Sequence, residues 1–198
     1  MKVIFLDFDG VITIPPKWYI KADKLKYIKQ IVDTTGAKIV ISSSWRMKSV
    51  EETIEKIIGR PKRCPRNKML NWFINNLYDV TPWCADKKYY KTGRGGEIQT
   101  WLDNHPEVNN YVILDDDGDM MDQQLFHFVQ TNYEDGITEL ETNWAIKILN
   151  KKYFQNSMAI NFKLRYEWLK KCEGLQNRQE ELWKYNDHCK TFNIKKYE

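Results

Sequence analysis

The stretch of sequence that decides the fold is Lys2-Val-Ile-Phe-Leu-Asp7, which runs directly into Phe8-Asp9-Gly10. A short apolar run that is rich in β-branched and aromatic residues and ends in an acid is typical of a buried central strand. Apolar residues at helical spacing follow from about residue 21 to residue 34, and Gly36 stands where a helix C-terminus favours glycine. The next apolar run, Ala37 to Ile41, predicts a second buried strand.

Strand, helix and strand in this order form a βαβ unit, which predicts a parallel sheet with a right-handed crossover. The alternation continues along the chain up to about residue 150, with a polar connection over residues 79–96. The further helices are expected over 49–58 and 138–150, each opened by a capping box, and over 67–78 and 97–104, and the further strands over 111–114 and 125–130. We therefore predict an α/β protein with a Rossmann-like open parallel sheet and helices on both faces.

Composition limits the class of protein. Hydrophobic residues make up 42% and charged residues 29% of the 198 residues, which is ordinary for a globular protein. No run of eighteen apolar residues exists, so we expect no membrane-spanning helix and no membrane partner. The first eight residues reach an acid at Asp7, unlike a signal peptide, and the four cysteines form no C-x-x-C pair. We expect a cytoplasmic protein with reduced thiols, whose oligomeric state the sequence leaves open.

The net charge of +4 is unevenly distributed. Residues 1–150 hold 20 Lys and Arg against 21 Asp and Glu, whereas residues 151–198 hold 11 against 6. We predict a catalytic domain over 1–150 and a basic, aromatic helical extension over 151–198, which either packs on the domain or binds single-stranded nucleic acid. A second basic segment, Arg60 to Lys68, is either a solvated loop or a contact for a phosphate backbone.

Polar side chains follow three of the predicted strands at the point where each strand ends. Asp7 and Asp9 follow the first, Ser42 to Ser44 the second, and Asp115 to Asp119 a later one. Because ligands bind at the carboxyl ends of parallel strands, we expect these side chains to converge. A cluster of carboxylates needs a cation, and an all-oxygen set suits Mg²⁺ better than zinc. Such a metal beside hydroxyl and cationic groups predicts phosphoryl chemistry.

These segments resemble the motifs of the haloacid dehalogenase (HAD) superfamily of phosphotransferases. The stretch from Phe5 to Val11 is similar to the first motif, Ser42 to the second and Leu114-Asp115-Asp116 to the acidic fourth, in the right order over residues 2–150. A closer resemblance is to the HAD domains of RNA-repair proteins. It is carried by Ser43-Ser-Trp-Arg46, by Arg94-Gly-Gly-Glu97-Ile98 with Trp101, and by Ile113-Leu-Asp-Asp-Asp117.

The resemblance implies roles for individual residues. Asp7 would be the nucleophile that forms an aspartyl-phosphate, and Asp9 the general acid and base, with its backbone carbonyl on Mg²⁺. Ser42 would bind a phosphoryl oxygen. Asp115 and Asp116 would complete the metal ligands with Asp7 and Asp9, and Asp119 remains an alternative ligand.

The third motif departs from the family pattern, which usually places a lysine at the start of the helix before the acidic strand. Here Arg94 stands closest to that helix and Lys91 lies three residues earlier. We predict that Arg94 is the catalytic cation, because a guanidinium grips phosphate in a bidentate way. Lys91, Ser43 and Arg46 are predicted to contact the substrate.

Access to the site indicates the substrate class. One turn and one helix fill residues 10–41, and residues 47–93 leave room for two short helices, so no large cap is expected. An uncapped site admits a bulky substrate, and a phosphorylated nucleic-acid end, specifically a 3′-phosphate on DNA or RNA, is the leading hypothesis. The alternatives are a phosphatase of free nucleotides and a nucleic-acid-binding module without catalysis.

Overall fold

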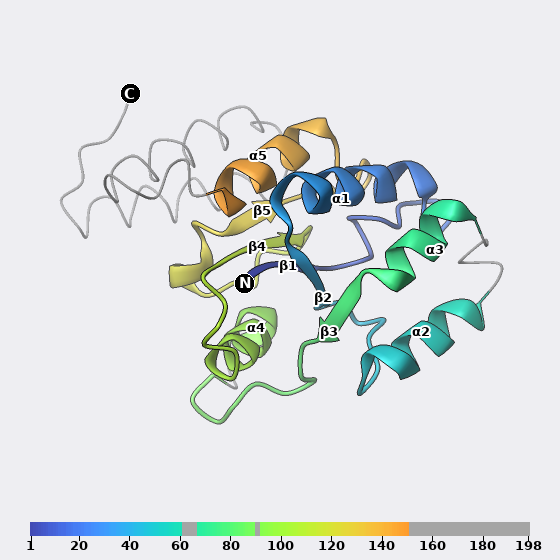
Figure 1. Cartoon of the computed structure of the whole chain (residues 1–198). Helices are drawn as coiled ribbons and strands as arrows, with labels where there is room; N and C mark the ends of the chain where they lie inside the picture. Colours follow the sequence, from blue (N-terminus) through green and yellow to red (C-terminus); the bar gives the residue numbers. More distant parts are fainter. Residues whose placement is uncertain (61–66, 90–91, 151–198) are drawn as a thin grey trace. The chain divides into compact units, whose positions relative to one another are not determined.

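The computed structural model of the chain describes residues 1–60, 67–89 and 92–150 (Figure 1). A five-stranded sheet, with every pairing parallel, forms its centre in the order β3-β2-β1-β4-β5. The strands are β1 (Lys2–Leu6), β2 (Lys38–Ile41), β3 (Leu77–Val80), β4 (Asn110–Asp115) and β5 (Phe128–Gln130). This is the predicted α/β, Rossmann-like open sheet, with the strand that opens the sequence at its centre.

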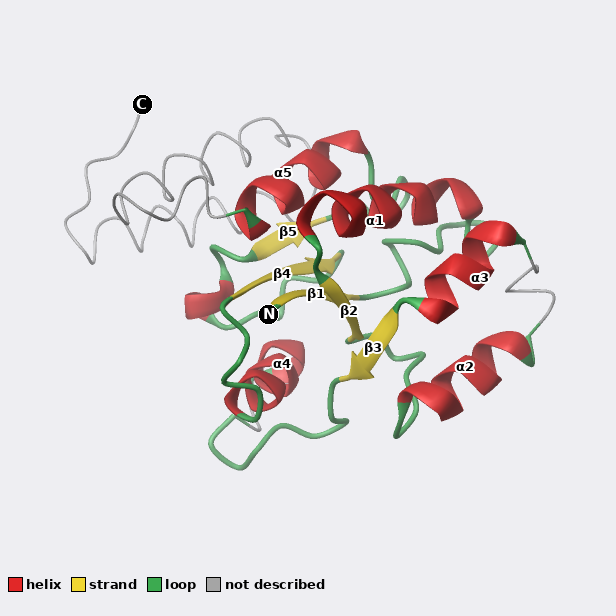
Figure 2. Ribbon diagram, in the orientation of Figure 1, coloured by secondary structure: helices red, strands yellow, loops and turns green. Residues whose placement is uncertain are grey.

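Helices cover both faces of the sheet (Figures 1 and 2). α1 (Ala22–Thr35) and α5 (Glu139–Leu149) lie side by side on one face, and α4 (Gly93–Asp103) covers the other. α2 (Val50–Ile58) and α3 (Lys68–Asn75) lie toward the β3 edge, and a short 3-10 helix, η1 (Asp122–Gln124), precedes β5. Within the described residues, one helix connects β1 to β2 and two short helices precede β3.

The core between the sheet and α4 comes from alternate residues of the central strands. Val3 and Phe5 of β1 are fully buried together with Ile98 and Trp101 of α4. The rings of Phe5 and Trp101 meet edge to face, 5.3 Å apart between centroids. Ile4 belongs to the opposite face and is also fully buried, as expected for a strand covered on both sides.

The capping box predicted for α5 is confirmed, whereas α2 shows only the N-cap half of the box predicted for it. The Ser49 side chain accepts a hydrogen bond from the Glu52 backbone N–H at the start of α2. Thr138 and Glu141 form the complete capping box of α5. Each bond satisfies a backbone N–H that has no partner within the helix.

Three predicted boundaries were wrong. The helix expected to reach residue 78 ends at Asn75, and β3 follows as an edge strand paired with β2. α4 begins at Gly93, four residues before the predicted start at Glu97. β5 is shorter than expected and begins at Phe128, because η1 and a turn occupy the residues before it.

Several predictions concern other parts of the chain. The extension over 151–198 and residues 61–66 of the basic segment lie outside the described residues, so the division at residue 150 stays a prediction. Among the described residues, no helix is long and apolar enough to cross a membrane.

Candidate active site

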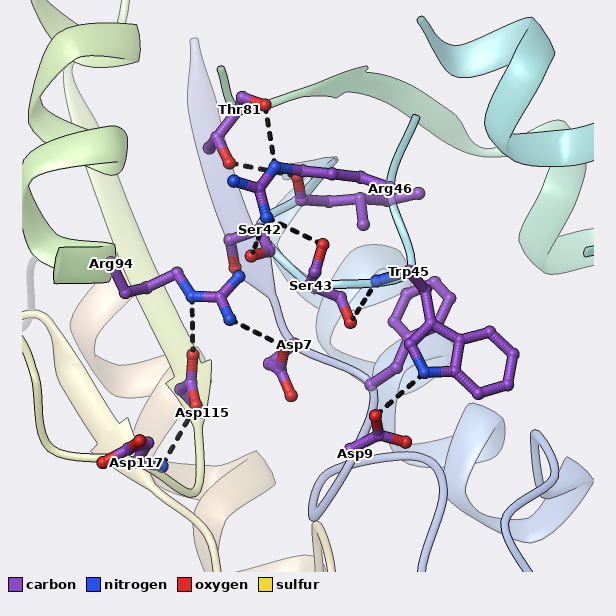
Figure 3. Close-up of polar contacts among 12 residues, drawn as sticks. Asp7, Asp9, Ser42, Ser43, Trp45, Arg46, Thr81, Arg94, Asp115 and Asp117 are labelled. Atoms are coloured by element: carbon purple, nitrogen blue, oxygen red, sulfur yellow. Dashed lines mark hydrogen bonds and ion pairs between the residues drawn. The ribbon is translucent and has the colours of Figure 1, made fainter. Parts of the chain in front are cut away.

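Asp7 lies at the carboxyl end of the central strand, between its two neighbouring strands (Figure 3). Its backbone N–H donates to the Leu114 carbonyl of β4 at 2.9 Å, and the Leu6 carbonyl accepts from the Ser42 N–H at 3.0 Å. These bonds continue the sheet ladder beyond β1. They fix Asp7 beside the ends of β2 and β4, where Ser42 and Asp115 stand.

A tight turn at Gly10 brings the loop after β1 against the acids of β4. The Phe8 carbonyl accepts hydrogen bonds from the backbone N–H groups of Ile12 and Thr13, at 2.9 and 2.8 Å. Gly10 has a φ of 72°, a conformation that favours glycine. A Cβ atom at this position would collide with the Asp116 carboxyl group. Glycine is therefore required here both for backbone conformation and for the close approach of Asp116.

The Asp9 carboxylate is held by two donors. It accepts a hydrogen bond from the Thr13 hydroxyl at 2.6 Å and one from the Trp45 indole N–H at 2.9 Å. Trp45 is itself buried and packs on Phe8, with 5.6 Å between ring centroids. The two bonds fix the orientation of Asp9, whose charge raises the pKa of the neighbouring Asp7.

Three carboxylates form a cluster that can hold a metal ion. Asp7, Asp115 and Asp116 each place an oxygen within 4.8 Å of the others. Burial is the main cause that raises the pKa of Asp7, to about 7, and the charges of Asp116 and Asp9 add to it. Burial likewise raises the pKa of Asp116 to about 6 and that of Asp115 well above its usual value.

The donor set of this cluster suits a hard divalent cation. All three ligands are carboxylate oxygens, the type that Mg²⁺ prefers. Asp115 Oδ2 is buried and accepts no hydrogen bond, although buried polar atoms are normally partnered. A cation bound here would satisfy this oxygen and offset the repulsion among the three charges.

Arg94 reaches the cluster from the first turn of α4. Its Nη2 atom lies 3.5 Å from Asp7 Oδ1, and its Nε atom lies 3.7 Å from Asp115 Oδ2. The Arg94 backbone N–H donates to Asp119 Oδ2 at 2.8 Å, so Asp119 caps the start of the helix. At Gly93 the φ is 54°, and a Cβ atom there would collide with the Asp119 carboxyl group.

Two buried donors at this edge of the sheet lack a hydrogen-bond partner: the Ser42 hydroxyl and Arg94 Nη1. Such groups normally find an acceptor, so a ligand that supplies oxygen atoms would complete both. The Ser43 hydroxyl differs, because it donates to Asp7 and thereby lowers the pKa of that carboxyl. The arrangement of donors beside the acids fits the oxygens of a phosphoryl group.

Arg46 is buried and bonded on all sides (Figure 3). Nη1 donates to the carbonyls of Ser42 and Ser43 at 3.0 and 2.8 Å. Nε donates to the Thr81 carbonyl and Nη2 to the Pro82 carbonyl, both at 2.9 Å. Nη2 also forms an ion pair of 2.7 Å with Glu97 of α4.

These partners use all five N–H donors of the Arg46 guanidinium. The prediction that Arg46 contacts the substrate phosphate therefore needs correction, because no donor is free to do so. Arg46 is instead a positioning residue, because its bonds connect the loop of Ser42 and Ser43 to the segment after β3 and to α4.

The structure brings together most of the residues predicted for the site. Asp7, Ser42, Arg94, Asp115 and Asp116 converge at the carboxyl edge of the sheet. Among the described residues, the carboxylate cluster contains neither the Asp9 side chain, which bonds to Thr13 and Trp45, nor that of Asp119. Lys91 lies outside the described residues.

Three residues that support the site were not assigned a role from the sequence. Thr13 and Trp45 hold Asp9, and Glu97 pairs with Arg46. Trp45 and Glu97 stand within the segments that resemble RNA-repair proteins, which is the one sequence signal that marks them. Thr13 carries no such signal, because its role depends on the turn at Gly10.

A comparison with protein families agrees with this geometry. The family model described as "HAD domain in Swiss Army Knife RNA repair proteins" matches residues 3–142. No curated protein and no solved structure matches the chain. The match covers all five strands except Lys2, the first residue of β1, and it includes every residue of the site described above. The chain therefore belongs to the HAD-type hydrolases, in the family of HAD domains found in Swiss Army Knife RNA repair proteins.

Proposed function

We propose that this protein is a Mg²⁺-dependent phosphomonoesterase that forms an aspartyl-phosphate on Asp7 and removes 3′-phosphates from nucleic-acid ends. The observation that carries the proposal is the convergence at one sheet edge of Asp7, a carboxylate cluster that could hold a metal ion, and two buried donors without partners. A nucleophile, a cation site and donors for phosphoryl oxygens are the parts that phosphoryl transfer needs.

Asp7, Asp115 and Asp116 would hold the Mg²⁺ ion, together with the Asp9 backbone carbonyl. When bound, the ion would neutralise the cluster and withdraw charge from the phosphoryl oxygens. Ser42 and Arg94 would bind the same phosphoryl group through their free hydrogen-bond donors. The ion-pair distances between Arg94 and the acids exceed those of direct hydrogen bonds, so this side chain can turn toward a phosphate.

In the first step a carboxylate oxygen of Asp7 attacks phosphorus, and the bond from phosphorus to the ester oxygen breaks. Asp9 donates a proton to the leaving oxygen, which departs as a hydroxyl group. In the second step Asp9 removes a proton from a water molecule that attacks phosphorus. The bond from phosphorus to Asp7 then breaks, and inorganic phosphate leaves. Thr13 and Trp45 keep the Asp9 carboxyl in place through both steps.

Two observations support a nucleic-acid end as the substrate. The family is named for RNA repair proteins. In the described part of the chain, the connection from β1 to β2 contains the single helix α1, and α2 and α3 precede β3, so the edge that bears Asp7 has no large cap domain from these segments. A site of this kind admits the end of a polymer.

Phosphate release from a 3′-phosphorylated oligonucleotide, in DNA and RNA forms, tests the proposal against a panel of free nucleotides. We expect activity with Mg²⁺ and none with EDTA. Asp7→Asn should reduce kcat at least 10³-fold, on the order of the loss of a covalent nucleophile. Asp117→Asn is the matched control, because Asp117 is an exposed acid in the same loop and should retain activity.

The possible results separate the alternatives. Preference for mononucleotides would favour a phosphatase of free nucleotides. Oligonucleotide binding without turnover of any phosphomonoester would favour a binding module. Hydrolysis that persists in Asp7→Asn would show that Asp7 is not the nucleophile.

A further inference from the structure

An indole ring stands exposed beside the candidate phosphate-binding loop. Trp83 follows β3 at its carboxyl end, two residues after Thr81, and half of its surface is exposed (50%). Its ring packs on the Arg46 guanidinium, whose central carbon lies 4.3 Å from the ring centroid. One face of the ring is therefore supported by protein, while the side chain remains open to solvent.

The support beneath Trp83 is rigid. Arg46 is 1% exposed and bonds to the backbone that follows two neighbouring strands, at Ser42 and Ser43 after β2 and at Thr81 and Pro82 after β3. The Pro82 carbonyl directly precedes Trp83, so the same guanidinium fixes both the ring and the chain that carries it. A binding group that is held in place before the ligand arrives loses little entropy on binding.

The Trp83 ring also lies near the candidate active site. A single guanidinium group separates the indole of Trp83 from the loop of Ser42, and the charge of Asp7 acts on that guanidinium. The ring therefore lies next to the loop that would bind the phosphate, on the side of that loop where Arg46 holds the Ser42 carbonyl. Among the described residues, the other exposed aromatic rings are placed differently: Tyr78 lies on the edge strand β3, and Tyr133, in the loop after β5, packs on Trp18.

We propose that the exposed face of Trp83 is a stacking subsite for the nucleobase that adjoins the phosphate. This inference rests on the proposed function and names the part of the substrate that the phosphate pocket does not recognise. Every base has a flat π face, so a Trp platform binds nucleotides with little dependence on sequence. The guanidinium beneath the ring adds a cation–π contact that keeps the indole flat against it.

The test compares Trp83→Ala and Trp83→Phe on three substrates: a 3′-phosphorylated oligonucleotide, a nucleoside 3′-monophosphate and glycerol phosphate, which has no base. Loss of one base-stacking contact corresponds to roughly a 5- to 100-fold change in affinity. We expect Trp83→Ala to raise KM for the base-bearing substrates by this factor with little change in kcat. Activity on glycerol phosphate should stay within about twofold, and Trp83→Phe should restore most of the loss. Tyr78→Ala, which removes another exposed aromatic ring, should leave kcat and KM unchanged for all three substrates.

The substrates distinguish the source of the base. If Trp83→Ala raises KM for both base-bearing substrates, one nucleobase is enough to contact Trp83. If it raises KM for the oligonucleotide alone, a polynucleotide is needed to reach Trp83. An equal loss on glycerol phosphate would overturn the inference, because it would mean that Trp83 only supports Arg46. Unchanged KM values in Trp83→Ala would overturn it as well.

Failure of the proposed function is a separate outcome. If the wild-type protein hydrolyses none of the substrates, fluorescence anisotropy of a labelled 3′-phosphorylated oligonucleotide still measures the subsite. Weaker binding by Trp83→Ala than by Tyr78→Ala supports the platform, and equal binding by the two variants rejects it.

Discussion

Asp7→Asn should make the metal-free protein more stable while it abolishes turnover. Burial, together with the charges of Asp116 and Asp9, raises the pKa of the Asp7 carboxyl from 3.8 to about 7. The folded state therefore keeps a proton on Asp7 that the unfolded chain releases. The contribution of Asp7 to the free energy of unfolding is fully present below pH 3.8, where both states are protonated. It falls as the pH rises toward 7, because ionised Asp7 is unfavourable in its buried site. Asparagine has the shape of the protonated acid and never ionises.

The expected gain follows from this pKa difference. One pKa unit corresponds to 1.36 kcal/mol, so Asp7→Asn should raise the free energy of unfolding by about 1 kcal/mol at pH 4.5, by about 3 kcal/mol at pH 6 and by about 4 kcal/mol at pH 8. For a domain of this size the last value corresponds to roughly 10 °C in Tm. Above pH 7 the difference should no longer grow.

Urea and thermal unfolding in EDTA, at several pH values, measure the effect. Mg²⁺ should then reduce the difference at pH 8, because it stabilises the wild-type cluster more than a cluster that has lost one carboxylate. Asp117→Asn is the control for loss of an acid from the same edge of the sheet and should leave the stability nearly unchanged, since that side chain is exposed. A variant no more stable than wild type at pH 8, or a gain that is the same at pH 4.5 and pH 8, would refute the reasoning.

Three further predictions concern the structure around the site. Arg46→Lys should lower the free energy of unfolding by about 3 kcal/mol, because one ammonium cannot satisfy the four carbonyls and the Glu97 carboxylate; a loss below about 1 kcal/mol in urea unfolding would contradict this. Gly10→Ala and Gly36→Ala should each lower the free energy of unfolding by about 1 kcal/mol through the positive φ alone. Only Gly10→Ala, whose Cβ collides with Asp116, should also lose phosphatase activity. Equal phosphatase activities of the two variants would refute the requirement for close approach of Asp116. Burial lowers the pKa of His127 to about 4. As the pH falls from 7.5 to 4.5, the free energy of unfolding of the wild type should therefore drop by about 2 kcal/mol more than that of His127→Gln. If the free energies of unfolding of the two proteins, measured in urea, depend on pH in the same way, His127 is not the cause.

The clustering of polar side chains at one edge of the sheet could be predicted because it depends on a simple pattern. Apolar runs that end in Asp7, in Ser42 and in Asp115 mark buried parallel strands, and parallel topology brings their carboxyl ends to one side. Arg94 was assigned from the resemblance to the third motif and from its short distance along the chain to the predicted helix; it lies beside Asp7 and Asp115, and its catalytic role stays a prediction. Neither inference needed any knowledge of side-chain contacts.

The role of Arg46 could not be predicted, for a reason that can be traced to β3. The sequence Leu77-Tyr-Asp-Val80 alternates in burial like an edge strand, but it follows α3 without a glycine or proline to separate them. The apolar spacing of the helix therefore continues into this strand in the sequence, as far as Tyr78. Because the sequence does not reveal β3, it does not indicate that the Thr81 and Pro82 carbonyls lie near Arg46, and a substrate contact stays open to its guanidinium.

The two arginines of the candidate site differ in their hydrogen-bond partners, and this difference favours a structural role for one and substrate binding for the other. Arg46 has a protein acceptor for every N–H, all of them in hydrogen-bond range, and moving it would leave buried carbonyls without donors. Arg94 has ion-pair distances of 3.5 and 3.7 Å and a buried Nη1 atom without an acceptor. Binding a phosphoryl group costs Arg94 no strong bond and gives its free donor an acceptor. Arg46 holds the Ser42 carbonyl and the Trp83 ring, and in the proposed reaction Arg94 is the cation that binds the substrate.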